Sequence, residues 1–125
     1  MRKTPPPLSG APAVRREKNY TAESGYVYRS FYLGNRAAEG GTEYVFEVSA
    51  DRHGFMLVSV ALVEAALARW QSSHARDLAA TERYAIAKMS LLRAFDQCPA
   101  PSEMPREVIV SAADVADILE TLGID

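Results

Sequence analysis

Residues 55–70 read FMLVSVALVEAALARW, and the spacing of the apolar side chains changes within this stretch. The first six residues form a nearly continuous apolar run, which is typical of a buried strand. From Leu62 to Trp70 the apolar residues instead recur with the 3.6-residue period of a helix. A strand that leads directly into a helix predicts a domain that combines both kinds of element.

Residues 26–33, farther upstream, alternate with the period of two that an extended strand has. Even-numbered positions, mostly tyrosine, fall on one side of this strand, and odd-numbered positions fall on the other. Turn-forming residues then bracket a loop over residues 34–42. A second strand is predicted over residues 43–48, so the three strands should form an antiparallel meander.

The C-terminal part is predicted to contain a long helix, a short strand and a last helix. The long helix should end near Gln97, because a proline-rich stretch follows it. Residues 108–110 favour a strand, and Ser111 and Asp114 have the spacing of a capping box. The expected order is β-β-β-α-α-β-α. The fold class is therefore predicted to be α+β, with a mostly antiparallel sheet and helices packed on one face.

The first 20 residues differ in composition from the rest of the chain. They include three consecutive prolines, and five basic side chains stand against the single acidic Glu17. The whole chain has a formal net charge of −2, so the remainder is acidic. We expect a disordered, Pro-rich basic leader over residues 1–20 and a single α+β domain over residues 21–125. The leader residues that could contact an anionic partner are Arg2, Lys3, Arg15, Arg16 and Lys18.

Cysteine usage and hydropathy indicate a cellular compartment. Cys98 is the only cysteine, which rules out an intrachain disulfide and favours a reducing environment. No apolar run approaches the roughly 20 residues that span a bilayer. The basic start is not followed by the apolar segment of a signal peptide. We therefore expect a cytoplasmic protein that does not act at a membrane.

Catalytic chemistry has little support in the sequence. There are two histidines, and only His53, in a turn with Asp51, has a candidate partner for acid–base work. An enzyme that uses this pair is kept as a remote option. The chain lacks a phosphate-binding glycine loop, a nucleophile elbow and metal-ligand spacing. We expect no catalytic residue, no metal site and no cofactor.

The tyrosine row of the first predicted strand is the one group of residues that suggests a binding surface. If helices cover the opposite side of the sheet, the row is exposed and can stack on a ligand or a partner; the alternative is that it belongs to the core. Charged residues of the long helix, Lys88 among them, are expected on a solvated face. The candidate interface or ligand face comprises Tyr26, Tyr28, Tyr32, Arg29 and Tyr44.

Two hypotheses for function follow from these patterns. The first is a non-catalytic interaction or small regulatory protein, homodimeric, whose tyrosine-bearing hairpin forms the interface with a second copy or another protein. The second is a binding module for a small ligand or single-stranded nucleic acid, which uses the tyrosine row and the basic leader. Nucleic acid is disfavoured because an acidic domain repels a phosphate backbone.

Overall fold

The structure of the protein is a computed structural model in which residues 6–50 and 54–125 are described. These residues form one five-stranded sheet, three α-helices and a short 3-10 helix. The expected α+β fold class with a mostly antiparallel sheet is confirmed. In chain order the elements are β1 (Lys18–Thr21), β2 (Val27–Ala38), β3 (Gly41–Ala50), β4 (Met56–Val63), α1 (Glu64–His74), α2 (Ala80–Gln97), η1 (Pro101–Glu103), β5 (Glu107–Ile109) and α3 (Ala112–Thr121).

The strands lie in the order β1-β2-β3-β4-β5. The first four pair antiparallel, and β5 runs parallel to β4. The predicted order lacks β1, which is four residues long and crosses the predicted domain boundary at residue 20. In β1, Lys18 pairs with Ser30 and Tyr20 with Tyr28 of β2. A strand this short carries too few residues for an alternating pattern to be recognised.

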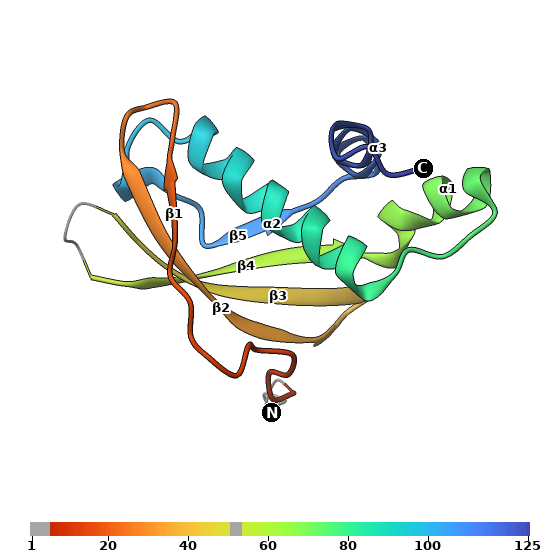
Figure 1. Ribbon diagram of the computed structural model, residues 1–125, viewed down its shortest axis with the longest axis horizontal. Helices are drawn as coiled ribbons and strands as arrows, with labels where there is room; N and C mark the ends of the chain where they lie inside the picture. Colours follow the sequence, from red (N-terminus) through yellow and green to blue (C-terminus); the bar gives the residue numbers. More distant parts are fainter. Residues whose placement is uncertain (1–5, 51–53) are drawn as a thin grey trace.

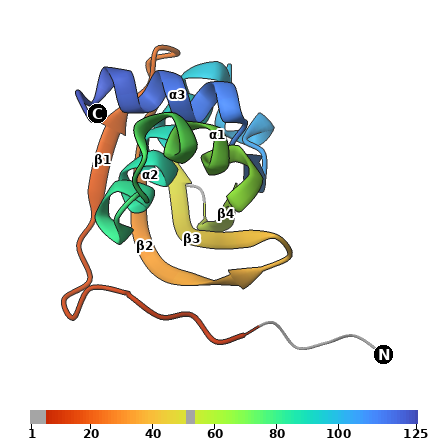
Figure 2. The same cartoon turned by 90° about the vertical axis from the view of Figure 1, so that its right-hand side faces the viewer.

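All three helices lie on the same side of the sheet, and α1 and α3 pack against each other (Figures 1 and 2). The core lies between this side of the sheet and α2. At its centre the Tyr28 ring stacks on Phe95 of α2, with ring centroids 4.2 Å apart and planes 6° from parallel. Other buried sheet residues that face the helices are Tyr44, Phe46, Val48, Val58, Val60 and Leu62.

The β2–β3 hairpin has a shorter tip than the sequence suggests. β2 continues to Ala38, and only Glu39 and Gly40 form the turn. The prediction of a loop over residues 34–42 is therefore wrong. Gly34 does adopt the positive φ of a turn residue, 122°. This conformation occurs at an irregularity within the strand, and glycine adopts it without steric cost because it has no Cβ.

That irregularity is a β-bulge at Leu33. Tyr32 pairs with Phe46 and Gly34 with Val45, so two neighbouring residues of β3 face three of β2. A bulge of this kind reverses which residues face the helices. Before it, even-numbered residues of β2 face the helices; beyond it, odd-numbered residues do.

The change from strand to helix comes later than predicted. Leu62 pairs with Thr42 as part of β4, and α1 begins at Glu64 and continues to His74. Leu62 is buried in either arrangement, so the apolar pattern alone cannot separate the last strand residues from the first helical turn. Pairing with β3 decides in favour of the strand.

The predicted capping box of the last helix is confirmed. The backbone N–H of Asp114 donates to Ser111 Oγ at 3.1 Å, and the backbone N–H of Ser111 donates to the Asp114 carboxylate at 3.0 Å. Two amides at the start of α3 are thereby satisfied. The helix places Val115, Ile118 and Leu119 in the core.

Glu82 fixes the start of α2 in a similar way. Its carboxylate accepts hydrogen bonds from both terminal guanidinium nitrogens of Arg76, at 2.9 and 3.0 Å, and from the backbone N–H of Ala79 at 2.8 Å. These bonds favour the charged carboxylate. The Arg76 hydrogen bond, followed by that from Ala79, lowers the pKa of Glu82 from 4.5 to about 2.

Replacing this carboxylate should change the pH dependence of stability. Because the pKa of Glu82 is lower in the folded state, its stabilisation is complete above pH 4.5 and is lost as the pH falls toward about 2. We expect Glu82→Gln to lower the free energy of unfolding above pH 4.5, with the difference from wild type shrinking below it. Urea denaturation across this range measures the effect. A difference that stays constant with pH would contradict it.

Candidate functional site

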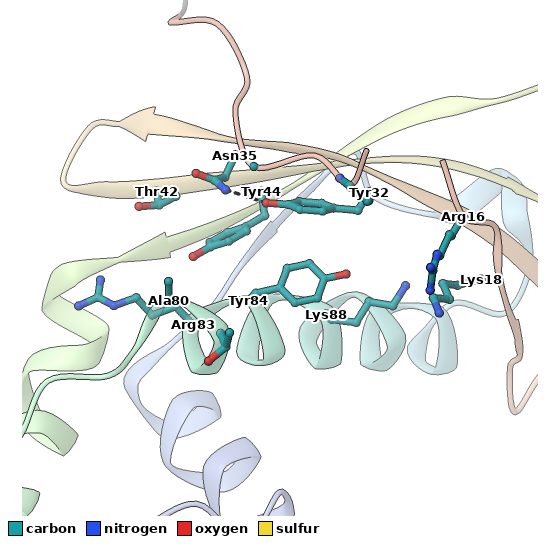
Figure 3. A pocket seen from close by; sticks show the side chains of 13 residues that line it. Arg16, Lys18, Tyr32, Asn35, Thr42, Tyr44, Ala80, Arg83, Tyr84 and Lys88 are labelled. Carbon is teal, nitrogen blue, oxygen red and sulfur yellow. Dashed lines mark hydrogen bonds between the residues drawn. The ribbon is translucent and has the colours of Figure 1, made fainter. Parts of the chain in front are cut away.

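A cavity of about 660 Å³ lies between α2 and the helix-facing side of the sheet (Figure 3). Strands β2 and β3 form one wall and α2 forms the other. The N-terminal segment, residues 9–17, and the start of β1 close one side. The residues that line it are Gly10, Pro12, Arg16, Lys18, Tyr32, Asn35, Thr42, Tyr44, Ala80, Thr81, Arg83, Tyr84 and Lys88.

The β-bulge in β2 shapes the sheet wall of the cavity. Because the bulge reverses the alternation, Asn35 falls on the same side of the sheet as Tyr32. The Asn35 side-chain amide donates a hydrogen bond to the Tyr32 hydroxyl at 2.7 Å. Tyr44 of β3 and Tyr84 of α2 complete an aromatic lining. The ring centroids of Tyr84 and Tyr32 are 4.8 Å apart.

Lys88 of α2 contacts the sheet through a hydroxyl group and one aromatic ring. Its Nζ donates to Ser30 Oγ at 3.0 Å and lies 5.4 Å from the centre of the Phe46 ring. Burial, and to a smaller degree the nearby charge of Lys18, lower the pKa of Lys88 below its usual range. Lys88 is therefore a half-buried cation beside a second cation.

Three cations, Arg16, Lys18 and Lys88, lie together at one end of the cavity, the end next to β1 (Figure 3). Among the described residues, the ion pairs involve none of the three. No Asp or Glu is among the described residues that line the cavity. Arg83, at the other end, is different, because it pairs with Glu64 and donates to the backbone carbonyl of Leu78 at 3.1 Å.

Burial also affects the tyrosines of the cavity. It raises the pKa of Tyr32, Tyr44 and Tyr84 above the usual tyrosine value. Their hydroxyls stay protonated at neutral pH and can donate hydrogen bonds. The cavity thus combines aromatic surface, neutral hydroxyl donors and unpaired positive charge.

The structure separates the residues of the candidate tyrosine face. Tyr28, 1% exposed, and Tyr44, 5% exposed, lie on the helix-covered side, so the core alternative holds for both. Tyr32 and Tyr44 border the cavity described above. Tyr26 lines a second cavity, of about 310 Å³, at the other end of the sheet. Arg29 lies on the opposite side of β2 and pairs with Glu17 at 3.6 Å.

The basic residues of the N-terminal segment are also separated. Arg16 and Lys18 point into the cavity (Figure 3). Arg15 lies on the far side of the sheet, where it pairs with Glu47 and its guanidinium carbon lies 4.1 Å from the centre of the Phe31 ring.

Several sequence predictions fall on parts of the chain that are not described. Arg2 and Lys3 lie outside the described residues, as do Asp51 and His53. Cys98 is described and buried, and its Sγ donates to the carbonyl of Ala100 at 2.8 Å.

One cavity residue of α2 differs from its sequence-based expectation. Lys88, expected on a solvated face, is half-buried. A signal was present: Tyr84, Lys88, Leu91 and Phe95 are spaced by four, three and four residues, which places them on one face of a helix. A lysine inside an apolar stripe indicates a buried or functional cation.

Other kinds of site find no support in the described part of the chain. It contains no group of three or more His, Cys, Asp or Glu side chains that could hold a metal ion. None of its helices is both long and apolar enough to cross a membrane. The chain matches no family model, no curated protein and no solved structure.

The N-terminal wall of the cavity depends on Gly34. Ser9 and Asn35 exchange backbone hydrogen bonds of 2.9 and 2.8 Å, which brings the segment against β2. A Cβ at Gly34 would lie 2.6 Å from the carbonyl oxygen of Ser9. Any side chain at this position must therefore push the segment away.

Gly34→Ala should release the N-terminal segment from β2. We expect trypsin to cleave after Arg15 and Arg16 faster than in wild type, as followed by mass spectrometry. Gly25→Ala is the matched control, since Gly25 also has a positive φ, 94°, but a Cβ there would meet nothing within 4 Å. Equal acceleration in both variants would show that backbone strain, and not the lost contact, is responsible.

Proposed function

We propose that the protein is a binding module for a small ligand with an aromatic or other apolar body, seated in the cavity between α2 and the sheet. The observation that carries this proposal is the cavity itself. Its volume of about 660 Å³ falls within the range of about 300–1,000 Å³ that small-molecule pockets occupy. The absence of enzymatic activity stays a prediction.

The lining supports a ligand more than a simple packing defect. Three tyrosine rings from three different elements, β2, β3 and α2, border the same space. Rings of this kind present flat apolar surface together with polar hydroxyl groups.

Filling the cavity should abolish the binding of an apolar aromatic probe. Thr81 is exposed and borders the cavity, so Thr81→Trp reduces its volume without disturbing the core. We expect the neutral dye N-phenylnaphthylamine to bind wild type and fluoresce, and to bind Thr81→Trp about tenfold more weakly or not at all. Fluorescence titration measures both affinities.

Thr121→Trp is the matched control, because it adds the same ring at an exposed threonine of α3, which does not border the cavity. It should bind the dye as wild type does. If wild type does not bind the dye, or if Thr81→Trp binds it unchanged, the proposed function is wrong.

A second candidate function is supported by the other side of the sheet. This side, the open face, faces away from the helices and carries exposed apolar residues. Phe31 of β2, Glu47 of β3 and Leu57 of β4 are cross-strand neighbours in one line. The ring centroids of Phe31 and Phe55 are 6.1 Å apart. The large apolar residues of this side that are more than a third exposed are Val27, Phe55, Leu57 and Ile109.

We propose a second copy of the chain as the partner of the open face. The three arginines that pair across it, Arg15, Arg29 and Arg36, each have a glutamate partner. Two copies can therefore meet over these strands with the arginine charges neutralised in pairs. Glu107, at the β5 edge of the face, is exposed and forms none of the ion pairs of the described residues. Exposed apolar side chains that cluster on one sheet face are typical of protein interfaces.

A charge among the exposed apolar residues of the open face should prevent this association. Leu57 of β4 is 56% exposed and lies in line with Phe31 and Glu47, so Leu57→Glu should give a monomer where wild type is a dimer. Leu122→Glu, at a 38% exposed leucine that ends α3, is the control and should stay dimeric. Light scattering after size-exclusion chromatography measures the masses. A monomeric wild type would rule out the dimer.

A further inference from the structure

We infer that the cavity selects an organic anion, a molecule with an apolar or aromatic body and one acidic group, and that Lys88 and Lys18 bind the acidic group. This inference rests on the proposed function and names the ligand class of the same cavity. Its basis is the juxtaposition of half-buried Lys88, exposed Lys18 and Arg16 along one end of an aromatic cavity.

The described residues form no ion pair with these cations. Among the described residues, the partners of Lys88 Nζ are a hydroxyl, Ser30 Oγ, and the Phe46 ring. Asp96, two helical turns farther along α2, is already engaged, because it accepts from the Tyr20 hydroxyl at 2.6 Å and the Glu23 backbone N–H at 3.0 Å. Within residues 6–50 and 54–125, the space next to Lys88 therefore lacks a negatively charged acceptor.

The position of the Lys88 ammonium group beside Lys18 is unfavourable in the ligand-free protein. Partial burial removes water from the ammonium group of Lys88, and Lys18 repels it. A bound carboxylate, sulfonate or phosphate ester would relieve both effects through charge-assisted hydrogen bonds. Groups that cost stability in the free protein and favour a ligand are typical of binding sites.

The aromatic part of the cavity determines the chemical character of the rest of the ligand. Tyr32, Tyr44 and Tyr84 line its middle, and the cations stand at one end (Figure 3). A free inorganic anion would leave the aromatic surface empty, and a neutral apolar ligand would leave the cations unpaired. A small molecule with an acidic end and an apolar body satisfies both parts.

A pair of dyes that differ by one acidic group tests this inference. Anilinonaphthalene sulfonate has the same aromatic body as N-phenylnaphthylamine plus a sulfonate. We expect wild type to bind the sulfonate dye more tightly than the neutral dye. Lys88→Met should weaken binding of the sulfonate dye about tenfold or more relative to binding of the neutral dye, so that the preference for the sulfonate dye is lost. Added salt should weaken only the sulfonate dye.

Two further variants make the result specific. Lys18→Met, at an exposed position of the same cluster, should weaken the sulfonate dye to a smaller extent. Arg69→Met removes one exposed positive charge from α1, which does not border the cavity, and should leave both dyes unchanged. Lys88→Met should also raise the urea midpoint of the free protein, whereas loss of a merely structural lysine would lower it.

The outcomes separate this inference from the proposed function. If Thr81→Trp abolishes neutral-dye binding but Lys88→Met does not affect the sulfonate dye, the cavity binds ligands and the anion inference is overturned. If neither dye enters the cavity, both proposals fall. Lys88-dependent displacement of the sulfonate dye by a single-stranded oligonucleotide, with none by the short carboxylic acid octanoate, would overturn the small-molecule class in favour of nucleic acid.

Discussion

The stack of Tyr28 on Phe95 sets the position of α2 across the sheet, with the two ring centroids 4.2 Å apart. From this point the helix runs antiparallel to β2. Ser30 then meets Lys88 and Tyr32 meets Tyr84, as both chains proceed toward the far end of the sheet. The Tyr28–Phe95 contact belongs to the core, whereas the Tyr32–Tyr84 contact borders the cavity. Between them, Lys88 lies next to the small side chain of Ser30. A shift of α2 by one turn would therefore change the core and the cavity together.

The features that depend on local periodicity could be predicted from the sequence. The alternation of residues 26–33, the change of period after residue 60 and the capping box at Ser111 give the α+β class. Features that depend on pairing could not. The β1 strand is too short for a pattern, and the bulge at Leu33 appears only when β2 is aligned with β3. Because the bulge reverses the alternation, no pattern within β2 alone places Asn35 beside Tyr32.

The candidate site was predictable only in part, because its residues come from elements far apart in the chain. Tyr32, Tyr44, Arg16 and Lys18 were all singled out in the sequence, yet nothing in the pattern joins them in one cavity. The side of the sheet that the helices cover decides this, and both sides of β2 are apolar enough to be covered. Lys88 was misplaced because its charge was given more weight than its position in an apolar stripe of α2.

The four residues Arg15-Arg16-Glu17-Lys18 show how a short charged segment can serve two surfaces. Arg15 and Glu17 contact the open face, where they pair with Glu47 and Arg29. Arg16 and Lys18 face the cavity, where no described carboxylate meets them. Alternation in an extended chain thus places neutralised charge on one side of the sheet and unpaired positive charge on the other. In an acidic chain, this local excess of positive charge is the physical basis for inferring an anionic ligand in the cavity.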